Sequence, residues 1–193
     1  MAMNMNRRSV LQAAMGIAAL PLLGLGSRVA FGADGEITVR IEKDISNLDP
    51  ANRVGSVEGN IITSVCQTLA RFKPGTTLEW EPEAAKTITQ VSETEIAFEL
   101  NPGQMFTGGY GELTAEDVKF SYERFKPSDD GKKVAYADDW AALDHVEVTG
   151  KYTGRLLFKN PAPAIFAIGI CDPSGGLISK KATKELGDRS PPR

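Results

Sequence analysis

The side chains that could support catalysis are few and widely spaced. His145 is the only histidine of the 193-residue chain, and Cys66 and Cys171 are its only cysteines. A general base needs a partner within hydrogen-bond reach, and a metal site needs several closely spaced ligands. Aspartate pairs at 129–130 and 138–139 are typical of solvated loop charges or helix caps. We therefore expect His145 to be a strand-end imidazole, and we predict no enzyme, no metal site and no cofactor.

Sequence motifs and charge exclude further classes of function. The chain has no phosphate-binding loop, no dinucleotide fingerprint and no GxSxG nucleophile elbow. Its formal net charge is −3, and the two signs are mixed along the chain rather than clustered. Nucleic-acid binding normally needs a basic patch, so we expect no nucleic-acid partner.

The two cysteines allow two interpretations. In an oxidising compartment Cys66 and Cys171 could form a disulfide, although their spacing does not decide it. Cys66 also lies on an apparent helical face with apolar residues, which favours a buried free thiol.

The best-defined unit is a strand, a turn and a helix ending near Arg124. Apolar residues at alternate positions from Ile96 to Leu100 predict a strand with one buried face. Asn101-Pro102-Gly103 ends that strand, because proline has no amide donor and glycine tolerates a positive φ. Thr114 and Asp117 have the spacing of a helix capping box. The following helix places three apolar side chains on one face: Val118, Tyr122 and Phe125.

The other patterns predict short, mixed elements. There is no regular alternation of strand and helix, so the expected class is α/β or α+β rather than a doubly wound nucleotide domain. We expect a strand at 37–41 and a helix from Ser56 through Ile61, Val65 and Leu69 to about Phe72. A turn at 73–75 and an irregular or briefly helical stretch at 79–86 should follow. In the second half we expect a short helix at 140–143, a hairpin of 145–149 with 155–159, an apolar helix at 164–170 and a last helix at 179–186 capped by Ser179.

Several of these residues also resemble a known family. The run LTAEDV at 113–118, followed by FSYER at 120–124, is similar to the signature of family 5 (peptide/nickel-type) extracellular solute-binding proteins of ABC transporters. Leu48-Asp49-Pro50 resembles the leucine-aspartate-proline element of that family. The resemblance runs from about residue 37 to residue 187 in family order, although Phe106 to Tyr110 depart from the usual pattern.

The resemblance implies a fold and a function. The implied fold is mixed α/β and type II periplasmic-binding-protein-like. Residues 34–193 would form the N-terminal part of the first lobe, with a smaller subdomain around 60–160 and the second lobe absent. The implied function is that of a monomeric periplasmic protein that captures a peptide or similar small solute for an ABC permease in the inner membrane. We expect a truncated chain that binds ligand weakly or not at all by itself. The alternatives are an exported interaction domain or inactive remnant of this fold, and an enzyme exported by the twin-arginine route.

The resemblance also implies ligand-binding residues. The stretch after the leucine-aspartate-proline element lines the family's cleft, and it corresponds here to Arg53, Val54, Gly55 and Ser56. Aromatic residues that face the ligand from the subdomain correspond to Tyr136 and Trp140. The alternatives are a loop that merely caps the next helix through Ser56, and ordinary core packing for the two aromatic residues.

The N-terminus is typical of an export signal. Arg7-Arg8 precede an apolar run from Val10 to Leu25, which fits a twin-arginine signal within residues 1–33. Cleavage is expected near Ala33 or Asp34, and the absence of cysteine at that boundary argues against a lipid anchor. A general secretory route and a retained anchor are the alternatives, although the run is shorter than a membrane span.

Overall fold

A four-stranded antiparallel sheet carries the core of the chain. The computed structural model describes residues 39–76, 78–128 and 131–186, so the expected export signal and the residues from Gly187 onward lie outside the described part. The chain divides into two units, Met1–Arg40 and Ile41–Arg193, and the account that follows concerns the second. None of the helices in the described residues has the length and hydropathy of a membrane-spanning segment.

The sheet has the strand order β3, β4, β6, β5. Its strands are β3 (Ala85–Ser92), β4 (Glu95–Leu100), β5 (Leu143–Val148) and β6 (Thr153–Phe158). Ile96, Phe98 and Leu100 are buried, which confirms the alternating pattern read from the sequence. Phe98 lies opposite Gly154 in the register. A Cβ atom on Gly154 would lie 2.6 Å from the Phe98 ring, so glycine is required for this close cross-strand packing. The predicted hairpin is confirmed as β5 and β6.

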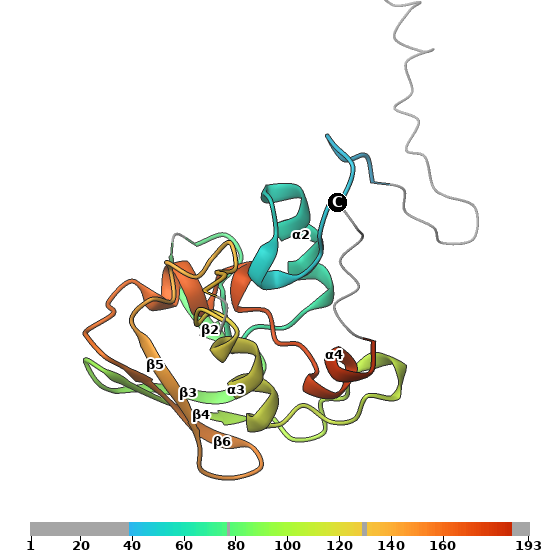
Figure 1. Cartoon of the computed structure of the whole chain (residues 1–193). Helices are drawn as coiled ribbons and strands as arrows, with labels where there is room; N and C mark the ends of the chain where they lie inside the picture. Colours follow the sequence, from blue (N-terminus) through green and yellow to red (C-terminus); the bar gives the residue numbers. More distant parts are fainter. Residues whose placement is uncertain (1–38, 77, 129–130, 187–193) are drawn as a thin grey trace, which may run out of the picture. The chain divides into compact units, whose positions relative to one another are not determined.

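Helix α3 (Ala115–Glu123) packs across one face of this sheet (Figure 1). The Asp117 carboxylate accepts the Thr114 N–H at 3.0 Å and the Thr114 hydroxyl at 2.8 Å, so the predicted capping box is present. Val118 and Tyr122 are fully buried below it. The second oxygen of Asp117 accepts the N–H of Lys180 at 3.0 Å, at the start of α4 (Lys180–Leu186). One carboxylate therefore fixes the beginnings of two helices.

The core under α3 is closed by an aromatic cluster. Trp140 is 2% exposed and stacks on Phe125 with ring centres 4.9 Å apart, and it packs at 4.4 Å against Tyr122. The expected helix at 140–143 is wrong, because residues 135–142 form successive turns linked by hydrogen bonds three residues apart, such as Leu143 N–H to Trp140 C=O at 2.9 Å. These turns insert Trp140 into the core directly before β5.

The predicted helix from Ser56 is correct at its start but too long. Helix α2 (Ser56–Val65) ends at Cys66, whose backbone is extended. Leu69 lies outside the helix, and Phe72 is the last residue of strand β1 (Ala70–Phe72). Strand β1 pairs with β2 (Trp80–Pro82), within the stretch expected to be irregular or helical. The carbonyl of Leu69 accepts the N–H groups of Glu83 and Ala85 at 3.0 and 3.2 Å. A partner distant in sequence therefore overrides the helical apolar pattern.

The remaining short elements complete the chain. Residues 39–41 have no strand, so the described part of the expected strand at 37–41 is wrong. The predicted apolar helix is the π-helical turn η4 (Phe166–Ile170), and Ser179 caps α4 by accepting the Ala182 N–H at 3.1 Å. Short 3₁₀ turns lie at η2 (Pro50–Asn52), η3 (Thr107–Gly109) and η5 (Pro173–Gly175). Cys66 and Cys171 are both free thiols.

We predict that Asp117→Ala lowers the free energy of unfolding by about 2 kcal/mol, because it leaves main-chain donors at the starts of α3 and α4 without an acceptor. Urea denaturation of the variant measures this loss. The matched control is Glu116→Ala, which removes the neighbouring exposed carboxylate and its ion pair with Lys180. That change should cost less than about 0.5 kcal/mol, and equal losses in the two variants would contradict the capping role.

Candidate functional site

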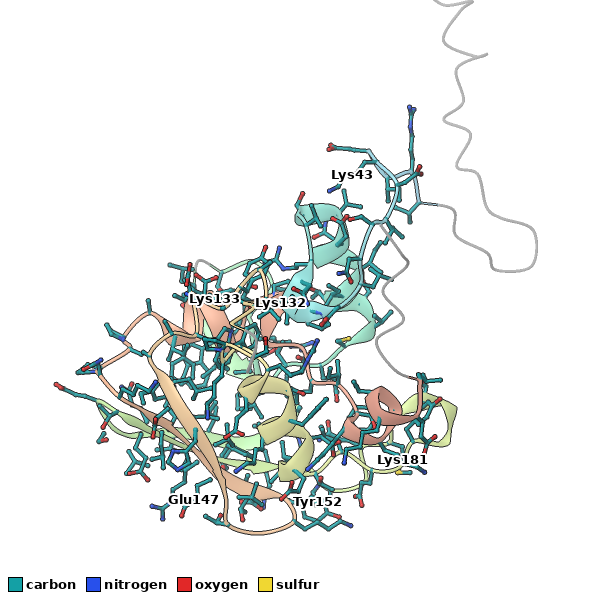
Figure 2. All side chains as sticks on the ribbon, in the orientation of Figure 1. Lys43, Lys132, Lys133, Glu147, Tyr152 and Lys181 are labelled. Carbon is teal, nitrogen blue, oxygen red and sulfur yellow. The ribbon has the colours of Figure 1, made fainter. Side chains whose placement is uncertain are left out.

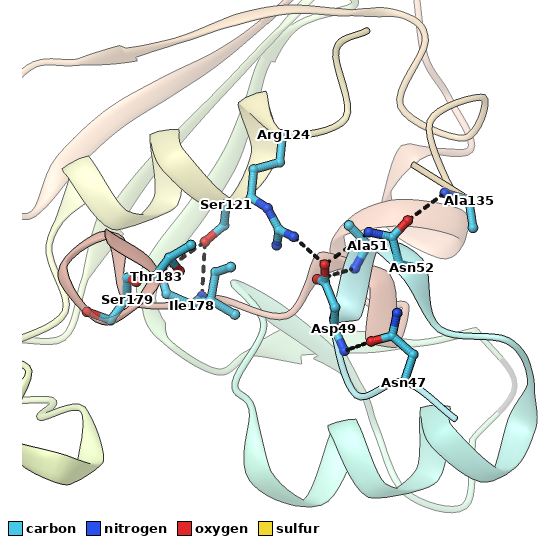
Figure 3. A network of polar contacts seen from close by, with 10 residues as sticks. All are labelled: Asn47, Asp49, Ala51, Asn52, Ser121, Arg124, Ala135, Ile178, Ser179 and Thr183. Carbon is cyan, nitrogen blue, oxygen red and sulfur yellow. Dashed lines mark hydrogen bonds and ion pairs between the residues drawn. The ribbon is translucent and has the colours of Figure 1, made fainter. Parts of the chain in front are cut away.

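The segment expected to line a ligand is built on the carboxylate of Asp49. This carboxylate accepts the Ala51 N–H at 3.1 Å and the Asn52 side-chain amide at 3.0 Å, which fixes the turn η2. It also pairs with the guanidinium of Arg124 at the end of α3 (Figure 3). The leucine-aspartate-proline element and the last residue of the FSYER run therefore form one ion pair across 75 residues of sequence.

The same turn holds the loop that carries Tyr136. The side-chain oxygen of Asn52 accepts the Ala135 N–H at 3.2 Å (Figure 3). The carbonyl of Ala51 accepts the Tyr136 N–H at 3.3 Å. The guanidinium carbon of Arg53 consequently lies 4.3 Å from the centre of the Tyr136 ring. Two residues expected at the ligand are brought into direct contact by this packing.

Arg53 is fixed from a second side by Asp172. Its Nη2 atom lies 2.8 and 3.0 Å from the two carboxylate oxygens of Asp172, and both side chains are mostly buried. Asp172 is the N-cap residue of η5 and accepts the Ser174 N–H at 2.8 Å, just as Asp49 caps η2. The sequence signal that could have revealed this partner is the second Asp-Pro pair at 172–173, which repeats Asp49-Pro50.

Val54, Gly55 and Ser56 connect Arg53 to α2. Val54 is 66% exposed, and Gly55 is the extended N-cap residue of the helix. Ser56 is the first helical residue, and the helix start has no side-chain cap, so the alternative in which Ser56 caps α2 does not hold. Among the described residues, no hydrogen bond uses the N–H groups of Val54 or Gly55. Within the described part of the chain, these two main-chain donors are therefore without a partner.

Glu58, in the first turn of α2, is a buried carboxylate that sequence reasoning missed. It is 0% exposed, accepts the Ser46 hydroxyl at 3.0 Å and lies 3.2 Å from Lys43 Nζ. The largest effect on the pKa of this carboxylate is a hydrogen bond from the main-chain N–H of Glu58, which lowers it. Burial raises the pKa, whereas Lys43 and Ser46 lower it further, and the resulting pKa is about 2. The carboxylate is therefore ionised in the folded protein at neutral pH.

The other expected residues lie apart from this site. Trp140 belongs to the aromatic core beneath α3, which favours the core-packing alternative for this residue. His145 is half-buried as the third residue of β5, and its Nδ1 lies 2.8 Å from Oδ2 of Asp144, whose pKa it lowers. No group of three or more His, Cys, Asp or Glu side chains that could hold a metal occurs in the described ranges.

We predict that Asp49→Ala lowers the free energy of unfolding by about 2 kcal/mol, because it removes the η2 cap and leaves Arg124 unpaired. Amide chemical shifts should change from residue 50 to 56 and at residues 135–136. Asp44→Ala, which removes an exposed carboxylate in the same segment, should change stability by less than about 0.5 kcal/mol. Unchanged shifts at 135–136 would refute the proposed link between the two loops.

The depressed pKa of Glu58 predicts a pH dependence of stability. A lowered folded-state pKa stabilises the protein above the ordinary value of 4.5, and this contribution disappears as pH falls toward about 2. The difference in unfolding free energy between the wild type and Glu58→Gln should therefore be largest at neutral pH and shrink through this window. Urea denaturation at several pH values measures it, and a constant difference would contradict the assignment.

Comparison with known proteins identifies the family of this chain. Residues 79–192, more than half of the chain, match the model of bacterial extracellular solute-binding proteins, family 5, middle region. No curated protein sequence matches the chain. The described fold is similar to a solved solute-binding protein, MoaA of A. tumefaciens R10 in complex with mannopinic acid, with 30% identity and a TM-score of 0.68 over 75% of this chain and 29% of that chain.

Two further solved structures share the fold. The substrate-binding domain of an oligopeptide ABC transporter from Bacillus anthracis is 19% identical, with a TM-score of 0.65 over 75% of this chain and 30% of that one. DppA from Helicobacter pylori in complex with the peptide STSA is 26% identical, with a TM-score of 0.59 over 74% and 30%. The chain thus spans about three tenths of the length of these structures.

The expected mixed α/β fold of periplasmic binding proteins is confirmed. The chain belongs to the family 5 bacterial extracellular solute-binding proteins, which are binding proteins and not enzymes.

Proposed function

We propose that this chain provides substrate-binding surface in an ABC import system and that its solute is a peptide or a similar small molecule. Solved proteins of this fold bind a peptide in one case and mannopinic acid in another. The observation that carries the proposal is the main chain at Val54, which is exposed, and at Gly55, which is half-buried and extended. The N–H groups of these two residues have no partner among the described residues. Such a stretch can pair with the backbone of an extended ligand.

The surroundings of this stretch suit recognition without side-chain specificity. Gly55 has no side chain, so a ligand backbone can approach its main chain closely. Arg53 is held by Asp172 and Tyr136 and therefore presents the stretch in a fixed conformation. The Tyr136 ring supplies apolar contact area at low entropic cost beside it. In this proposal Arg53, Val54, Gly55, Ser56 and Tyr136 form the ligand surface, while Trp140 supports it from the core.

The cellular setting is proposed from the sequence. Residues 1–33 would direct export, by the twin-arginine route, and the mature monomeric chain would begin near Asp34 in the periplasm. Its partner would be an ABC permease of the inner membrane. Ligand would stabilise a closed arrangement of lobes by contacts made only in that state.

We predict that a mixed peptide library at millimolar concentration raises the melting temperature of the chain and shifts the amide signals of residues 53–56. A ligand that binds only the folded state must stabilise it. Gly55→Leu should weaken this response about tenfold, since its side chain covers the free main chain. The fold should persist, because the nearest atom to a new Cβ is the flexible end of Lys43, at 3.3 Å.

Ser64→Leu is the matched control, because it adds the same side chain at the other end of α2. It should leave the ligand response unchanged. A melting temperature that does not respond to the library, with unchanged signals at 53–56, would refute the proposed function.

A further inference from the structure

We infer that the hollow beside Trp80 and Phe166 is a binding site for a small, uncharged compound that contains an aromatic ring. The inference goes beyond the proposed function, because the hollow shares no residue with the proposed ligand surface. Lys43, whose Nζ lies next to Gly55, is well separated from β2 and η4, which carry the two aromatic residues (Figures 1 and 2). The hollow is therefore a second site, for a different class of ligand.

The first argument is an aromatic stack that stays open to solvent. Trp80 of β2 and Phe166 of η4 stack with ring centres 4.5 Å apart and ring planes 15° apart. Phe166 covers one face of the indole, yet Trp80 remains 36% exposed. A ligand ring that extends this stack covers the exposed aromatic surface and gains the energy of a further aromatic pair. The two residues therefore form a stacking surface that exists before a ligand binds.

The second argument is the chemistry of the hollow beside this pair. Its volume is about 350 Å³, and sites for small molecules have volumes of about 300 to 1,000 Å³. The described residues that line it are aromatic or aliphatic, with Gln90 as the only polar side chain among them. A charged ligand would lose its hydration there without gaining an ion pair from these residues. The lining therefore favours an uncharged ligand.

Gln90 supplies the polar group that can orient such a ligand. It lies on β3 with an exposed side chain, and its amide makes no hydrogen bond among the described residues. A side-chain amide both donates and accepts hydrogen bonds. One hydrogen bond from Gln90 to a neutral substituent fixes the direction of the ring, while stacking provides most of the contact area. The ligand class is thus an aromatic ring with an uncharged hydrogen-bonding group.

Leu78 lines the hollow in a conformation that is unusual for leucine. Its φ is 59°, and it is the only residue other than glycine with a positive φ in the described part of the chain. A bulky side chain makes this conformation unfavourable, and residues held in such conformations are frequent at ligand-binding positions. The Leu78 side chain is 67% exposed. A ligand in the hollow therefore covers a second apolar side chain besides Trp80.

The extent of the hollow favours a small molecule over a protein partner. Seven described residues line it, whereas a stable protein interface uses about 20 to 30 residues on each side. A single aromatic compound can cover the exposed part of the stack and reach Gln90 at the same time. The inference is therefore limited to a free small molecule.

The test compares three probes of similar size on the full chain by NMR titration. Benzamide has an aromatic ring and a neutral amide, cyclohexanecarboxamide has a saturated ring, and benzoate carries a negative charge. We expect benzamide to bind about tenfold more tightly than either of the other probes. It should shift the indole N–H signal of Trp80 and the amide signals of residues 78–80 and 163–167. Signals of residues 53–56 should not move.

Two variants test the side chains that line the hollow. Trp80→Leu keeps an apolar side chain but removes the ring, so it should abolish the preference for benzamide over cyclohexanecarboxamide. Gln90→Ala, at an exposed strand position, should weaken benzamide binding about threefold, and it decides the question if Trp80→Leu does not fold. Val91→Ala is the matched control, because Val91 is the next exposed residue of β3 and does not line the hollow. This change should leave the binding of all three probes unaltered.

Three results would overturn the aromatic site. They are equal binding of the three probes, benzamide shifts that leave the Trp80 signal unmoved, and benzamide binding that neither Trp80→Leu nor Gln90→Ala alters. Shifts confined to residues 53–56 belong to the second of these results, because they place the probe on the proposed ligand surface instead. None of the three contradicts the proposed function, whose own test is the response of residues 53–56 to peptides.

Discussion

The ion pair between Asp49 and Arg124 is the contact on which the arrangement of the site depends. It joins an irregular segment near the start of the described chain to the end of α3, which is itself fixed on the sheet. Because the same carboxylate also caps η2, the orientation of Arg53 and the attachment of the Tyr136 loop follow from it. A guanidinium and a carboxylate that are both mostly buried hold such a junction better than an exposed pair could.

Carboxylates that accept main-chain N–H groups recur throughout this fold. Asp117 accepts N–H groups at the starts of α3 and α4. Asp172 caps η5 and also pairs with Arg53. Glu112 accepts the Gly103 N–H at 2.6 Å and pairs with Lys151, which closes the glycine-rich turn before α3. Lys151, followed by Gly103 and Tyr152, lowers the pKa of Glu112 to about 2. The chain thus uses acidic side chains to satisfy donors that short helices and turns leave open.

The main chain at Val54 and Gly55 differs from these capped turns. Arg53 before this stretch is held by Asp172, and α2 begins directly after it, yet the N–H groups of Val54 and Gly55 are unpaired among the described residues. Rigid surroundings with free main-chain donors are what a backbone-reading binding surface requires, since ordering the site on binding then costs little. The buried carboxylate of Glu58 lies beside it and is paired with the ammonium group of Lys43.

The sequence by itself determined the elements whose signals are local. Alternation from Ile96 to Leu100, the Thr114–Asp117 box and the β5–β6 hairpin were all predictable, because neighbouring residues along the chain specify them. The family resemblance located the segment at Arg53 but not its contacts. Only the tertiary structure decided that Leu69 to Phe72 leave the helical pattern for β1, that Trp140 enters the core, and that Arg53 meets Asp172 across 119 residues. These outcomes depend on partners distant in sequence, whose pairing no local pattern encodes.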